Sequence, residues 1–309
     1  MASSVDPLYD LYMNKGLVPK EIASSGIIAV ICCVGIGLNS SLVYVTIKTK
    51  LLHSPCQILI ALYAFFASFV LFGNCVKFVI FAFGINYITL QTCFYIQIVP
   101  LIGTASAVML QLCIGIDRLI GVIFPFWYKA NGKYVTFKYI IGICCIRSIL
   151  CVFNTYIGSS AHWKKPVICT LAEPVHQPEN HYFADISALF TYCGEFLCYT
   201  LILLIIWRRK STIPENVQKL TISLSVLMSI GLICYILNVF FFYGIMPLLI
   251  LDAFTIEYFV FPISVVLQSL AYGSTAPVLF ICNGQYRKAF RKQFGYQEQQ
   301  VTAVQYLSN

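Results

Sequence analysis

Long runs of apolar residues dominate the chain and are separated by short polar loops. A bilayer core about 30 Å thick is crossed by about 20 helical residues, because each residue of an α-helix rises about 1.5 Å. Seven runs reach that length, so we predict an all-α integral membrane protein built as a bundle of seven transmembrane helices. The predicted spans lie near residues 25–47, 56–83, 90–122, 138–158, 185–207, 217–245 and 254–281.

The composition argues against a soluble protein. Of the 309 residues, 59% are hydrophobic and 10% are charged, whereas about 25% are charged in a typical soluble domain. The stretch between Glu21 and Asp117 contains no acidic residue at all. The net charge of +8 does not predict nucleic-acid binding, because the basic residues lie in short loops and not on an aqueous domain.

The basic loops predict the orientation. Lys48, Lys50, Lys129 and Arg208 lie in loops on one side of the membrane, and the loops on the other side are poorer in Lys and Arg. The positive-inside rule therefore places the N-terminus outside and the C-terminus in the cytoplasm. The predicted parts are an extracellular segment (1–24), the seven-helix domain (25–281) and a cytoplasmic surface helix with a tail (282–309).

The stretch from Arg287 to Phe294 alternates basic and aromatic residues. That pattern is typical of a short amphipathic helix on the inner membrane surface. A plain basic flank that ends the last span is the alternative.

The third run has the most distinctive pattern. It opens with Cys93 and ends with Asp117-Arg118-Leu119, and Pro125 follows. Charge within an apolar span is costly in lipid, so the Asp-Arg pair indicates a functional part. This stretch resembles the third transmembrane helix of rhodopsin-like G-protein-coupled receptors, in which Tyr usually stands at the place of Leu119. An arginine that merely reaches the inner interface is the alternative for Arg118, but it does not account for the spacing to Cys93 and Pro125.

Two other runs are similar to the same family. Asn39, in Gly-Leu-Asn-Ser-Ser-Leu-Val, is similar to the pattern of the first receptor helix, and we expect it to hydrogen-bond to neighbouring helices. Pro277, Phe280 and the pair Tyr286-Arg287 are similar to the end of the seventh helix and the start of the membrane-surface helix, although Phe280 replaces the usual Tyr. Proline removes a backbone hydrogen bond, so Pro277 predicts a kink. These segments are closest to the nematode serpentine chemoreceptors of class SX (Srsx).

The resemblance implies a switch. Arg118 would pair with Asp117 at rest and reach a heterotrimeric G protein when neighbouring helices move. Pro277, Phe280, Tyr286 and Arg287 would belong to the same coupling region.

The chain has fourteen cysteines, and most lie inside apolar runs, where cysteine behaves as a small hydrophobic residue. Cys93 and Cys169 stand apart, at the start of the third run and in the long loop after the fourth. The resemblance implies that they form the disulfide that ties the second extracellular loop to the third helix. Two free thiols remain the alternative.

Two charged residues lie well within spans, Arg147 in the fourth and Glu195 in the fifth. We predict that they pair, because an unpaired charge in lipid costs several kcal/mol. A Glu195 that faces a ligand cavity is the alternative.

A ligand would enter from the outer face, where the third, fifth, sixth and seventh helices converge. For most residues there, helix packing is the alternative role. The pocket candidates are Gln97, Leu101, Thr104, Glu195, Tyr235, Asn238, Phe242 and Glu257.

The function that these observations favour is a chemosensory receptor that binds a small molecule or peptide outside and signals through a heterotrimeric G protein. We expect it in the plasma membrane, surrounded by lipid, with the sensory cilium membrane as a narrower location. The alternative is a small-solute transporter or channel, but transporters usually carry internal repeats, and none is visible. We expect no enzyme activity, cofactor or metal, since the four His are scattered and a His-Glu-x-x-His motif is missing from the sequence.

Overall fold

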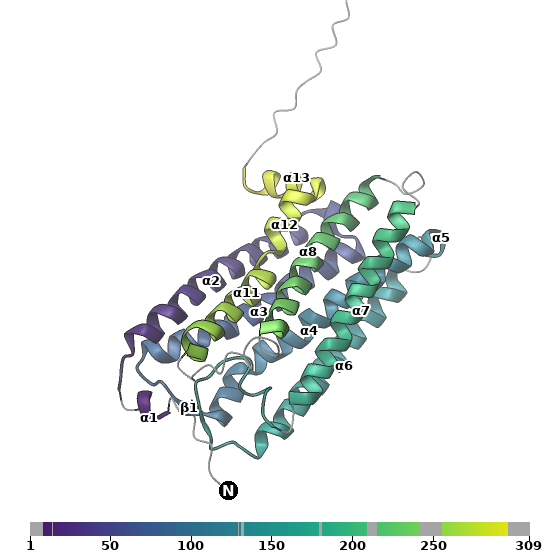
Figure 1. Cartoon of the computed structure of the whole chain (residues 1–309). Coiled ribbons are helices and arrows are strands. Elements are labelled where there is room, and N and C mark those ends of the chain that lie inside the picture. The colour runs from purple at the N-terminus through teal and green to yellow at the C-terminus, as the bar shows by residue number, and fades with distance from the viewer. Residues whose placement is uncertain are drawn as a thin grey trace, which may run out of the picture.

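The structure, a computed structural model, describes residues 9–13, 15–128, 130, 133–178, 181–208, 215–241 and 255–295. Long helices run side by side along one axis of the molecule (Figure 1). The bundle consists of α2 (Pro19–Lys48), α3 (Pro55–Ala82), α4 (Leu90–Ile123), α6 (Lys133–Ser160), α7 (His181–Arg208), α8 (Glu215–Val239) and the bent pair α11 (Phe261–Gly273) and α12 (Thr275–Cys282).

The predicted membrane bundle is confirmed. In length and apolar character, α2, α3, α4, α6 and α7 each suffice to cross a membrane, and α11 with α12 makes one further bent span. In α8 the apolar stretch is the shorter Ser225–Val239, and the predicted end of that span at residue 245 lies outside the described residues. The helices follow one another in the predicted order.

The first helix begins at Pro19, earlier than the predicted residue 25. Proline suits the first turn of a helix, where its missing N–H has no partner to lose. Glu21 made this turn look polar in the sequence, but the structure buries it against α3, where it pairs with Lys77.

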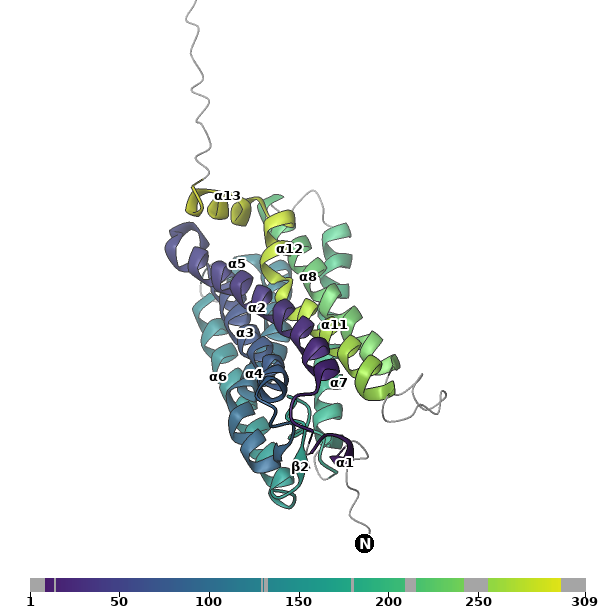
Figure 2. The same cartoon turned by 90° about the vertical axis from the view of Figure 1, so that its left-hand side faces the viewer.

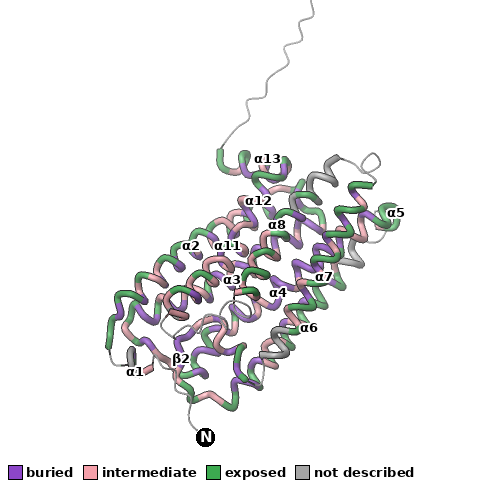
Figure 3. Tube along the Cα trace, viewed as in Figure 1, coloured by how far each residue is buried: buried purple, intermediate pink, exposed green. Residues whose placement is uncertain are grey.

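The bundle is assembled around α4, which packs against α3, α6 and α7 (Figure 2). It is the most buried of the long spans, whereas α6 and α7 have far fewer buried residues (Figure 3). Close backbone contact is possible because of glycine. A Cβ added to Gly73 of α3 would lie 2.7 Å from Pro100 of α4, and one added to Gly35 of α2 would lie 3.3 Å from the Cα of Gly273 in α11.

The seventh span bends by 47° between α11 and α12, at Ser274. Pro277 accounts for the bend, because its ring clashes with the carbonyl of Gly273 four residues earlier and it has no N–H to donate. The chain then turns at Asn283 into α13 (Gly284–Gln293), which lies across the end of the bundle (Figure 2). This is the predicted amphipathic helix.

The opposite end of the bundle carries short elements. Asn86 donates hydrogen bonds of 2.8 Å to the carbonyls of Tyr12 and Gly16, which holds the segment before α2 against this end. Following the predicted orientation, we call this the outer end and the end with α13 the inner end. The short elements of the outer end are α1 (Tyr9–Tyr12) and the antiparallel strands β1 (Ile88–Thr89) and β2 (Pro166–Val167). The inner end has two further short elements, a 3₁₀ turn (Lys50–Leu52) and α5 (Pro125–Trp127).

Candidate functional site

The inner end of α4 holds a closed cluster of charged and polar groups. Arg118 donates from Nη2 and Nε to Oδ2 of Asp117, at 2.5 and 3.1 Å. The carboxylate is buried and the arginine side chain is 13% exposed. The pair is therefore shielded from most of the water that weakens surface ion pairs.

Tyr128 completes this cluster and was missed in the sequence. Its hydroxyl donates to Oδ1 of Asp117 at 2.7 Å and accepts from Nη2 of Arg118 at 3.1 Å. The guanidinium also lies 5.9 Å from the ring centroid. Burial, and then the negative charge of Asp117, raise the pKa of Tyr128, while Arg118 acts in the opposite direction, so the hydroxyl keeps the proton that it donates.

Tyr128 follows α5, where the chain turns back toward the helix it has just left. Leu119, by contrast, packs against the hydrophobic core. A phenol thus reaches Asp117 and Arg118 from the following loop, while position 119 carries leucine. A polar aromatic residue three positions after Pro125 was the available signal. We refer to Asp117, Arg118 and Tyr128 as the latch.

The other predicted coupling residues connect α12 to α13. Arg287 donates to the carbonyl of Phe280 at 3.1 Å and to that of Ile281, so it caps the end of α12. Tyr286 is fully buried, and burial raises the pKa of its hydroxyl. The rings of Phe280 and Phe290 pack edge to face with centroids 6.0 Å apart. These contacts hold α13 against the end of α12.

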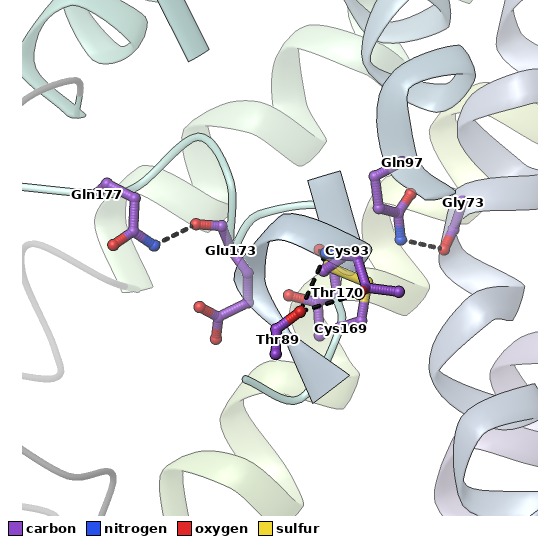
Figure 4. The surroundings of a disulfide bond; sticks show 9 residues. Gly73, Thr89, Cys93, Gln97, Cys169, Thr170, Glu173 and Gln177 are labelled. Atoms are coloured by element: carbon purple, nitrogen blue, oxygen red, sulfur yellow. Dashed lines mark hydrogen bonds between the residues drawn. A yellow bond between two sulfur atoms is a disulfide. The ribbon is translucent and has the colours of Figure 1, made fainter. Parts of the chain in front are cut away.

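At the outer end of α4, Cys93 is joined to Cys169 in a disulfide with Cα atoms 5.4 Å apart (Figure 4). The loop is held to α4 by backbone bonds as well, from Leu90 N to the carbonyl of Lys165 at 2.9 Å and from Gln91 N to that of Trp163 at 3.2 Å. The same helix therefore carries the fixed loop at one end and the latch at the other.

Three predicted pocket residues on α4 have packing roles in the structure. Gln97 is buried and donates to the carbonyl of Gly73 at 3.2 Å (Figure 4). Leu101 belongs to the hydrophobic core, and the Thr104 hydroxyl donates to the carbonyl of Pro100 at 3.0 Å.

Asn39 has the predicted interhelical bond, from its amide to the carbonyl of Tyr272 at 3.1 Å.

The predicted ion pair between Arg147 and Glu195 is wrong. Glu195 is buried and accepts from the Gln111 amide at 3.0 Å, while Arg147 donates to the Ser187 hydroxyl at 3.2 Å. Ser187 and Glu195 lie two turns of α7 apart, about 12 Å. The reason is an offset along the bundle: Arg147 reaches α7 at the level of Ser187, so its guanidinium and the Glu195 carboxylate do not lie at the similar depth that was expected.

The remaining pocket candidates lie on later helices. The ring of Tyr235 on α8 stacks on that of Tyr192 on α7 with centroids 3.8 Å apart, and Asn238 is partly buried. Phe242 lies outside the described residues. Glu257 falls in the π-helical turn Ile256–Val260, and its side chain is not among those described.

A cavity of about 50 Å³ does lie at the outer end, beneath the loop that follows Cys169 and between α2, α3 and α11. None of the described pocket candidates lines it; its polar lining includes Asn74, Lys77 and Gln268. Lys77 pairs with Glu21 at 3.0 Å, and both are buried. The sequence analysis missed this pair. Ligand pockets usually have about 300–1,000 Å³, so the cavity is too small for such a ligand as it stands.

The seven-helix bundle, the loop tied to its third span and the latch at the other end of that span define a multi-pass membrane receptor of the G-protein-coupled type. The family model for the serpentine type 7TM GPCR chemoreceptor Srsx matches residues 32–294. The chain belongs to this family, which is a receptor family and not an enzyme family. A comparison with curated proteins gives no match.

Proposed function

We propose that this chemoreceptor binds a small molecule or peptide at its outer end and activates a heterotrimeric G protein at its inner end, from the plasma membrane. The observation that carries the proposal is the closed latch. Arg118 is held by both Asp117 and Tyr128 in a site shielded from water. An arginine held in this way is unavailable to a partner protein until the helices around it move.

The geometry of α4 supports a connection between the two ends. The disulfide and the backbone bonds of the loop fix its outer end, and the latch lies at its inner end. A ligand that widens the outer cavity would shift the loop and the helix together. The shift requires only that the ligand bind the open state more tightly than the closed one.

The test uses cells that express the full chain with a panel of Gα subunits and sensors of G-protein dissociation. A library of small molecules and peptides is applied, and uptake of the same compounds is measured in parallel. We expect at least one compound to activate a G protein in the wild type without being taken up.

Arg118→Ala is expected to abolish that response at equal surface expression. Arg291→Ala is the matched control, because it removes an exposed arginine at the same end of the bundle. A response that persists in Arg118→Ala, or compound uptake that this variant retains, would refute the receptor mechanism. Staining of an N-terminal tag on unpermeabilised cells tests the plasma membrane location, and imaging in ciliated cells tests the sensory cilium.

A further inference from the structure

Arg147 is a cation near the middle of α6, and none of the carboxylates that the structure describes pairs with it. Among the described residues its hydrogen-bond partner is the Ser187 hydroxyl, and its Nε is buried with no partner. The ion pairs found in the described part of the chain, Lys77 with Glu21 and Arg118 with Asp117, lie elsewhere. A guanidinium at this depth is costly unless an anion or a set of acceptors compensates it.

The side chain lines a groove of about 290 Å³ between α4, α6 and α7. Met109, Leu112, Leu150 and Phe190 give the groove apolar walls, and Arg147 is the one charged residue among the described residues of its lining. A cavity of about 150 Å³ holds benzene, so this groove has room for a molecule about twice that size. From Arg147 the groove extends outward to Val175, in the loop that the disulfide ties to α4.

We propose that this groove binds an amphiphilic carboxylic acid. Its carboxylate pairs with Arg147 and its apolar chain lies against Leu150 and Phe190. The planar guanidinium matches a carboxylate through two parallel hydrogen bonds, and Nε is one of the donors such a pair uses. The apolar walls lower the local dielectric around the guanidinium, which strengthens the pair.

The depth of Arg147 favours a carboxylic acid over a phospholipid. A phosphate headgroup stays at the membrane interface, about 15 Å from the middle of a hydrocarbon core about 30 Å thick. A carboxylic acid can enter the membrane in its neutral form and lose its proton next to the arginine. The binding itself does not depend on G-protein coupling, so it can be tested without a G protein.

The experiment uses the full-length receptor in nanodiscs of zwitterionic phosphatidylcholine, with radiolabelled decanoic acid as the probe. We expect saturable decanoate binding that decanol, which has the same chain length without the charge, does not displace. Arg147→Gln is expected to weaken binding by about tenfold to a hundredfold, as for the loss of hydrogen bonds between charged groups. Arg291→Gln, at an exposed arginine of α13, is the matched control and should bind as the wild type does.

Leu150→Trp is a second variant, because it fills the groove and leaves Arg147 in place; Leu150 is half exposed and tolerates a larger side chain. It should weaken binding even if Arg147→Gln does not fold. Equal decanoate binding by the wild type and both variants would overturn the proposal. Displacement of decanoate by phosphatidylglycerol in the nanodisc, with the same dependence on Arg147, would overturn the carboxylic acid as the occupant and assign the site to an anionic headgroup.

Discussion

Tyr128→Phe is expected to raise the activity of the receptor without ligand. The substitution removes only the hydroxyl, and with it the hydrogen bonds to Asp117 and from Arg118. The ring that faces the guanidinium stays. If the latch holds the closed state, losing these bonds must favour the open one.

The structure sets the size of the effect. A hydrogen bond to a charged group contributes about 1.5–3 kcal/mol when it is buried. Tyr128 is partly buried, so water replaces some of each lost bond, and a net loss of about 1–2 kcal/mol from the closed state is reasonable. Since 1.4 kcal/mol is a factor of ten in an equilibrium constant, the open fraction should rise about 5–30-fold while it remains the minority.

The assay is ligand-free nucleotide exchange on a Gα subunit in membranes that carry equal amounts of receptor. Tyr139→Phe is the matched control, because Tyr139 is 69% exposed near the inner end of α6. We expect the control to leave basal exchange unchanged. Basal exchange in Tyr128→Phe that equals or falls below that of the control, with Arg118 intact, would refute the latch.

Three further predictions concern stability. Cys93→Ser should lower the thermal unfolding temperature in detergent, since losing a native disulfide costs about 2–5 kcal/mol. Cys169→Ser and the double variant should lower it by the same amount, and a double variant far less stable than either single one would contradict a shared bond. Lys77→Met should destabilise the receptor by about 3–5 kcal/mol because it leaves the carboxylate of Glu21 buried without its cation. Adding Glu21→Gln should recover part of that stability in a thermal shift assay, and a double variant without recovery would count against the pair. Asn283→Ala removes the N-cap of α13, which contributes about 1 kcal/mol to helix stability. Amide hydrogen exchange should become faster in α13 but not in α12, and unchanged exchange would show that the cap does not stabilise the helix.

The features that the sequence predicted well are those that depend on position along one helix. Span length follows from hydrophobic runs, so the helices appeared in the predicted order. The bend before Pro277 follows from the missing N–H of proline. The link between Cys93 and Cys169 came from the family resemblance, and the structure contains it.

The predictions that were wrong or missing depend on how neighbouring helices and loops are placed relative to one another. Hydropathy placed Arg147 and Glu195 at similar depth, but it does not give the tilt and offset of neighbouring helices, and Arg147 reaches α7 at Ser187, two turns from Glu195. Tyr128 was missed because its partners are reached only when the loop folds back. The pair of Lys77 and Glu21 was missed because Glu21 precedes the predicted first span and Lys77 lies near the end of the second, and hydropathy does not show that the two side chains face each other inside the bundle.

The contact between Gly35 and Gly273 has a consequence for natural variation. The backbones of the first and seventh spans touch there without any side chain between them, directly before the bend. A methyl group at Gly35 would lie 2.8 Å from Leu71 as well as close to Gly273, and one at Gly273 would lie 3.2 Å from the Cα of Gly35, so the neighbouring helices must shift to admit either. Receptors that carry alanine at one of these sites should therefore reach the cell surface in smaller amounts, and a lost response in such a variant would reflect failed delivery and not altered ligand preference.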